Sequence, residues 1–252
     1  MLRPLLLALS LLVLVACYQD DDDTLTGQTA ELALDFTAEF SDVPLRIQSG
    51  TYDYPTGEEL KVLLFQYYVS DLELLPRAGA PVPLSEIDLV RYETAGGSET
   101  VRRNFAAVPA GDYVGLRFGL GVKPSLNARD PSSFAADFVL NQDEFWNDRA
   151  RYVFAKIEAN ARLVDSTRFS TGLSYHMGAD ELYTTVQFDE AFRLRPGANR
   201  LTVVADVLAA LSDGRATFDI SDPTRQRVHG GNQAVATDIW NRLAAQFQLR
   251  TN

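Results

Sequence analysis

Alternation of apolar residues with polar or small ones constrains the fold of this chain more than any other feature of its sequence. The clearest example runs from Val114 to Val122, where every second residue is Val, Leu or Phe. Successive side chains of a strand point to opposite faces, so this spacing predicts a strand with one buried face. Gly115, Gly119 and Gly121 fall on the other face and predict a bulge or a close approach by other backbone.

Further segments repeat this pattern and indicate that most of the chain is β-structure. They are residues 32–36, 61–75 with a bend near Ser70–Asp71, 87–92, 152–157, 169–175, 184–188 and 201–207. Near the C-terminus, apolar residues instead recur at helical spacing from Val235 to Phe247. The sequence therefore predicts an all-β, Ig-like or Greek-key antiparallel β-sandwich with long loops and one C-terminal amphipathic helix. Without an internal repeat or a long linker, residues 31–250 are expected to form one domain.

The first residues have the features of a bacterial lipoprotein signal. Arg3 precedes an apolar run that is too short to span a bilayer, and the run ends in Val15-Ala16-Cys17. We expect cleavage after residue 16 and lipidation of Cys17, which is the only cysteine. The alternative is an ordinary signal peptide with a chance cysteine. Residues 17–30 contain four consecutive aspartates and are predicted to be a flexible acidic tether.

Charge and anchoring narrow the location and the partners. Tyr18, rather than an aspartate, follows the cysteine, which favours the outer membrane, facing the periplasm or the cell surface. The lipid anchor makes the membrane itself a partner. A net charge of −11 argues against nucleic acid, because an acidic surface repels phosphate.

Few residues suggest catalysis. The chain has two histidines, His176 and His229, and contains no HExxH metal motif, no GxSxG nucleophile motif and no phosphate-binding glycine loop. We therefore expect a binding protein, not an enzyme. Each histidine, taken alone, is more often structural or merely exposed than a ligand. His229 could supply a second nitrogen only if the fold brings its loop near His176. Trp146 lies near the end of a long connection, residues 124–148, and alone would indicate an aromatic anchor for that loop.

Several motifs in order resemble one family, the MbnP-like domain, named for the methanobactin-associated copper-binding protein. The resemblance runs from about Leu32 to Leu249. It rests on LDF at 34–36, GEEL at 57–60, FQYYVSDLEL at 65–74, VPAGDY at 108–113, FGLGV at 118–122, FW at 145–146, YVFAKIE at 152–158 and YHMG at 175–178. Asn241 and Phe247 match the family's terminal helix.

The resemblance implies an exported β-sandwich that binds copper. The resemblance assigns His176 as one ligand and Trp146 as the residue converted to kynurenine by a partner resembling di-haem cytochrome c peroxidases. Two residues after the tryptophan, copper-binding relatives can have a histidine; here the residue is Asp148, a third candidate ligand. The sequence also has Lys123 where the family has an aspartate, and Arg151 where it has a glycine.

Three functions remain open from the sequence. The first is a copper-binding lipoprotein of the cell envelope with Trp146, Asp148 and His176 at its site. The second is a metal-free binding or scaffold module at the outer membrane, and the third is a peroxidase substrate that retains no metal. Convergence of Trp146 and His176 at the surface would favour the first, and a deeply buried Trp146 far from His176 would favour the second.

Overall fold

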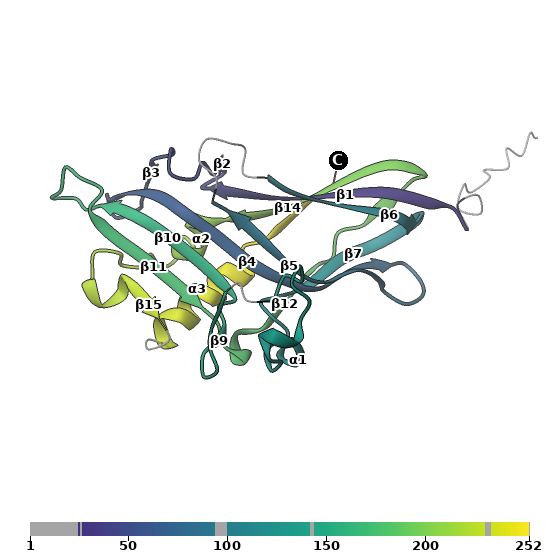
Figure 1. Ribbon diagram of the computed structural model, residues 1–252. Helices are drawn as coiled ribbons and strands as arrows, with labels where there is room; N and C mark the ends of the chain where they lie inside the picture. The colour runs from purple at the N-terminus through teal and green to yellow at the C-terminus, as the bar shows by residue number, and fades with distance from the viewer. Residues whose placement is uncertain (1–24, 26, 94–99, 142–143, 230–232, 252) are drawn as a thin grey trace, which may run out of the picture.

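The fold is built from two packed β-sheets. The computed structural model describes residues 25, 27–93, 100–141, 144–229 and 233–251. The expected signal peptide, Cys17 and most of the expected tether lie outside these residues. Figure 1 shows one sheet, with β1, β6 and β14, lying above a second sheet with β4, β10, β11 and β7. The prediction of an all-β sandwich is confirmed.

The smaller sheet has five strands around β1. They are β1 (Thr29–Phe40), β2 (Val43–Pro44), β6 (Thr100–Pro109), β14 (Gly197–Asp206) and β16 (Gln248–Thr251). Strand β1 pairs antiparallel with β6 and parallel with β14. The predicted sheet was antiparallel throughout, so this parallel pair is a difference. It arises because β14 follows β1 after more than 150 residues of chain, which is ample for a crossover.

The larger sheet has nine strands and is centred on β4 (Glu59–Pro76). The others are β3 (Tyr52–Asp53), β5 (Val82–Tyr92), β7 (Gly111–Leu120), β10 (Ala155–Arg162), β11 (Thr171–Met177), β12 (Thr184–Phe188), β13 (Phe192–Leu194) and β15 (Arg227–His229). Strand β4 is continuous through the predicted bend, but its pairing with β7 shifts register between Ser70 and Glu73, where Asp71 has a positive φ of 46°. The bend is therefore a bulge within one strand.

Short elements complete the chain. A separate two-stranded hairpin is formed by β8 (Phe145–Asn147) and β9 (Arg151–Tyr152). The helices are α1 (Pro124–Asn127), α2 (Val207–Leu211) and α3 (Gln233–Ala245), with 3-10 turns η2 (Pro131–Ser133), η3 (Asp180–Leu182) and η4 (Pro223–Arg225). No helix among the described residues is long and apolar enough to cross a membrane.

The predicted C-terminal helix is present, but it is not the end of the fold. Helix α3 ends at Ala245, and the chain continues into β16 at the edge of the smaller sheet. Phe247, predicted as part of the helix, lies in the connection and packs edge-on against Tyr67 and Phe118. Trp240 on α3 is fully buried and contacts Phe154. Phe247 thus anchors the connection between α3 and β16 in the core, at the point where the chain passes to the smaller sheet.

Strand β7 shows where simple alternation fails. Val114 was predicted to face the core, yet it is exposed, and its neighbour Tyr113 is buried. The pairing with β4 shifts register between Leu75 and Pro76, opposite this point. An extra residue in one strand reverses the direction of the side chains that precede it, which explains the error.

Candidate metal centre

A row of polar side chains crosses the face of the larger sheet that is turned away from the smaller one. Each residue pairs in register with the next across β5, β4, β10, β11 and β15, and we call these residues the polar row: Arg91, Gln66, Lys156, His176 and His229. Their in-register partners point to the same face because side chains alternate along each strand. Residues 65 and 67, 157, and 175 point the other way into the core.

The two histidines are neighbours at one end of the polar row. Strand β15 pairs parallel with β11 and sets His229 opposite His176. Their ring centroids are 4.7 Å apart with an interplanar angle of 74°. The two histidines, 53 positions apart in the sequence, are thus brought together by the pairing of an edge strand that ends at His229.

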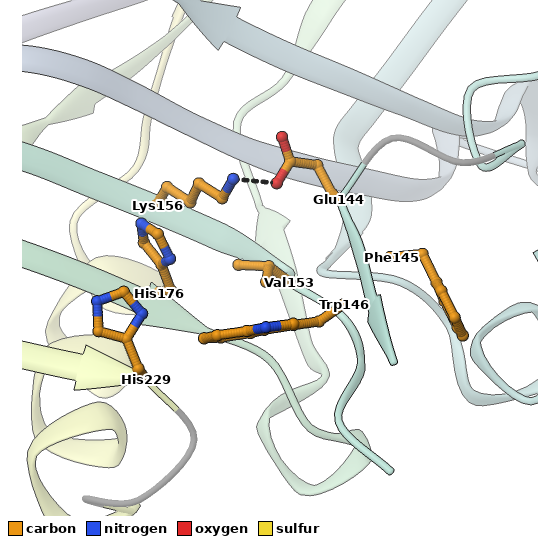
Figure 2. A pocket seen from close by; sticks show the side chains of 7 residues that line it. All are labelled: Glu144, Phe145, Trp146, Val153, Lys156, His176 and His229. Carbon is orange, nitrogen blue, oxygen red and sulfur yellow. Dashed lines mark ion pairs between the residues drawn. The ribbon is translucent and has the colours of Figure 1, made fainter. Parts of the chain in front are cut away.

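Trp146 completes a three-ring cluster with this pair. Its ring centroid lies 6.1 Å from that of His176 and 5.5 Å from that of His229. The tryptophan comes from hairpin β8–β9, and it is 44% exposed. Figure 2 shows its indole extending from the hairpin toward both imidazoles. Trp146 and His176 therefore converge near the surface, which is the arrangement that favours the first of the three functions.

An open cavity of about 350 Å³ is bounded by this cluster. Lys156 and Glu144 close one side, Val153 and Phe145 supply apolar wall, and the three rings form the remainder (Figure 2). Trp146 and His229 also border a second, more polar cavity, so the indole separates the two spaces.

A carboxylate orients His176. Its Nε2 lies 2.7 Å from Oε1 of Glu158 and 3.2 Å from the Ser174 hydroxyl. Glu158 is on the neighbouring strand β10, and Ser174 is on the same strand as His176, β11. Both contacts engage the same nitrogen and point Nδ1 away from them. Burial lowers the pKa of His176 below its usual range, although the hydrogen bond with Glu158 acts in the opposite direction. The ring is therefore neutral near pH 7, the form that donates a lone pair.

Hairpin β8–β9 is fastened to the sheet through a buried carboxylate. Glu144, whose side chain is only 5% exposed, makes ion pairs with Arg91 and Lys156 of the polar row. Burial raises the pKa of Glu144, but hydrogen bonds with Lys156 and Gln66 outweigh it and hold the pKa below the usual range. The backbone carbonyl of Glu144 also accepts a hydrogen bond from Val153. This residue thus positions Trp146, two residues further on, over the histidines.

Comparison with known proteins identifies the family of this chain. A family model described as MbnP matches residues 29–229, most of the chain. The chain belongs to the MbnP family. Among solved structures, MbnP from Methylosinus trichosporium is similar, with a TM-score of 0.56 and 16% sequence identity, over 89% of this chain and 99% of that chain. At this identity the likeness shows the fold. No curated protein sequence matches the chain.

The third predicted ligand is not brought into the cluster. Asp148 follows Trp146 at the tip of the hairpin, and its side chain is 99% exposed. Its carboxylate lies 3.8 Å from the guanidinium of Arg151, and the residue does not border the cavity of Trp146 and His176. The hairpin turn directs this carboxylate to solvent.

Two departures from the MbnP family pattern have structural explanations. Arg151 has a positive φ of 58°, a conformation that glycine adopts without strain, which accounts for the family's glycine. Here the guanidinium donates to the carbonyls of Asn127 and Arg129 at 2.8 and 2.6 Å, which offsets that strain. Lys123, in place of an aspartate, pairs with Asp71 and Glu86.

The structure meets the condition set for His229, because it brings this residue beside His176. The sequence assigned no role to Glu158 and Lys156, which belonged only to a family motif. Alternation alone places Lys156, Glu158, Ser174 and His176 on one face of their strands, and that signal could have identified the two charged neighbours. For His229 the sequence holds no comparable signal.

Proposed function

We propose that this member of the MbnP family binds copper between His176 and His229, beside the ring of residue 146. The observation that carries the proposal is the in-register pairing of the two histidines, with Trp146 packed against both rings. The chain has two histidines, and they lie on adjacent strands beside the tryptophan that is modified in the family. A shared role in binding explains this arrangement better than chance does.

The donor chemistry fits copper better than other metals. Neutral imidazole suits copper in either oxidation state. Zinc sites in proteins are usually four-coordinate and take at least three protein ligands. Within the described residues, no group of three or more His, Cys, Asp and Glu side chains could hold a metal ion. Two imidazoles therefore need a further donor, and the side chain at position 146 packs against both rings.

Oxidation of Trp146 would supply that donor. Kynurenine exposes an aromatic amine and a carbonyl, which tryptophan lacks. The half-exposed indole at the rim of an open cavity is accessible to a partner enzyme, which we propose resembles di-haem cytochrome c peroxidases. Copper bound here would supply a one-electron redox centre or a transferable cargo.

Neighbouring residues would hold the first ligand in place. Glu158 and Ser174 occupy Nε2 of His176, so Nδ1 is the nitrogen left for a metal. Such outer partners fix the tautomer and the ring orientation of ligating histidines.

We also propose that Cys17 is lipidated and that the protein resides at the outer membrane. Both parts of this proposal rest on the signal-like N-terminus.

One observation favours a second candidate, a metal-free binding module. The carboxylate of Asp148 points to solvent. The nearby carboxylates of Glu144 and Glu158 are already engaged by Lys156 and His176, which leaves the two imidazoles as the donors at the cluster. If Trp146 is never oxidised, the cavity would serve as a binding pocket without metal.

Peptide mass spectrometry and metal analysis of one native, membrane-extracted sample distinguish these functions. Cells should express the peroxidase and receive copper. We expect the peptide containing residue 146 to carry the mass of kynurenine, and about one copper per chain. A matched His176→Ala sample should keep the modification and lose the metal. Unmodified Trp146 without copper in the wild-type protein would refute the proposal and leave the metal-free module.

A further inference from the structure

The cavity beside the histidine pair is far larger than a metal ion. Its volume is about 350 Å³, whereas one water molecule occupies roughly 30 Å³ of liquid. A metal held by His176 and His229 would therefore leave room for a small ligand of several atoms. The apolar parts of the wall, Val153 and Phe145, do not supply that ligand.

Charge also indicates that a metal would not enter alone. The charged residues that line the cavity are Lys156 and Glu144, one cation and one carboxylate that pair with each other. As metal ligands, the two imidazoles and the side chain at 146 would add no charge of their own. A copper ion would thus add charge that these residues do not balance, and uncompensated charge is costly in a half-buried cavity.

Lys156 is placed to hold a compensating anion. Its side chain lines the cavity next to His176, its in-register partner on the adjacent strand. The ammonium has three donors, and its ion pair with Glu144 uses one of them. Figure 2 shows the Lys156 side chain above the imidazole of His176, with its ammonium turned toward Glu144.

We propose that the cavity binds copper together with a small monovalent anion, and that Lys156 is the residue that holds this anion. The inference rests on the proposed copper function. The anion is either inorganic or the carboxylate of an organic chelator, because both present a single negative charge to an ammonium group. Lys156 is then the residue that determines which copper complexes the cavity accepts.

Azide titration of the full-length protein loaded with Cu(II) tests the proposal. Azide bound to Cu(II) gives a charge-transfer absorption band, and ionic strength is held constant because salt screens charge. We expect Lys156→Gln, which keeps a hydrogen-bond donor toward Glu144, to weaken azide binding about tenfold or more. Lys156→Arg should retain most of it. Lys61→Gln, which removes a lysine from β4 outside this cavity, is the matched control and should bind azide as the wild type does.

The outcomes separate the two proposals. Equal azide affinity in wild type and Lys156→Gln, with copper bound in both, would overturn the anion site and leave the copper function intact. Absence of copper uptake by the wild type would overturn both. If Lys156→Gln does not fold, the Arg variant still decides: a loss there as large as that expected for Gln would contradict a charge role. Lys156-dependent displacement of azide by chloride would identify an inorganic anion, and by acetate a carboxylate; either supports the proposal.

Discussion

At the scale of single residues, the two histidines differ in how far the sequence predicts their role. The alternation of β11 places His176 on one face, and family motifs mark it as a ligand. His229 has no such context, because its strand has three residues and pairs parallel with a strand more than fifty residues earlier. A short edge strand carries too few residues for a pattern to specify its partner. The second imidazole therefore depends on tertiary structure.

Replacement of His229 tests its role directly. We expect His229→Ala to reduce copper affinity by about 100-fold or more, because it removes one of two imidazole donors. Stability should change little, since the residue is exposed at the end of β15. Competition with a chromophoric copper chelator measures the affinity. Arg227→Ala, on the same face of the same strand, is the control; an equal loss there would mean that disturbance of β15, not the imidazole, is responsible.

At the scale of elements, local patterns predicted strands well and irregularities poorly. The segments predicted near β1, β4, β11 and β12 correspond to strands, and the glycines of β7 do permit close approach. The outward direction of Val114 was missed because a bulge leaves no mark in apolar spacing. The parallel pairs of β1 with β14 and β11 with β15 were missed because the alternation does not encode which strands pair.

The glycine at position 115 gives a prediction for β7. A Cβ there would lie 2.1 Å from the backbone carbonyl oxygen of Phe188. Backbone cannot yield cheaply, so we expect Gly115→Ala to destabilise the protein by about 2 kcal/mol or more. Gly172→Ala on β11, where a Cβ would meet nothing within 4 Å, should change stability by less than about 0.5 kcal/mol. Urea denaturation measures both; equal effects would contradict the close approach.

Acid stability of the smaller sheet depends on Asp35 of β1. Its buried carboxylate accepts hydrogen bonds from Arg102 at 2.6 and 2.8 Å. The hydrogen bond with Arg102 holds the pKa of Asp35 below its usual range, although burial opposes this. The ionised form is therefore favoured by folding, so its contribution is present above pH 4 and is lost as the pH falls further.

We therefore expect Asp35→Asn to be less stable than the wild type at pH 7 by about 1 kcal/mol. The difference should shrink as the pH falls toward 3. Chemical denaturation across this range measures it. Asp148→Asn, at a side chain that is 99% exposed, is the control and should show no such trend. A difference for Asp35→Asn that stays constant with pH would contradict an ionised pair.

At the scale of the whole molecule, the β-sandwich positions hairpin β8–β9 over one face of the larger sheet. The larger sheet supplies both histidines and the cations that bind Glu144, and the hairpin supplies Trp146. The family motifs predicted the sandwich and two members of the cluster, Trp146 and His176. They did not predict that Asp148 would be turned away, because its direction depends on the hairpin turn and not on its spacing from Trp146.

Anchoring of the molecule is a separate prediction, because Cys17 lies outside the described residues. We expect the mature wild-type chain to begin at Cys17, to carry a lipid on it and to enter the detergent phase after cell lysis. Cys17→Ser should abolish the lipid, since serine has no thiol to accept it. Mass spectrometry of the N-terminal peptide measures both. A mature wild-type chain that starts elsewhere without lipid would contradict the proposed anchor.

The most direct test of the copper centre is anomalous diffraction at the copper absorption edge, from crystals of the matured protein loaded with copper. The proposed site predicts the strongest peak in the cavity between His176, His229 and the side chain at 146. Copper located instead at exposed carboxylates, or no peak while both histidine rings keep their positions, would contradict it.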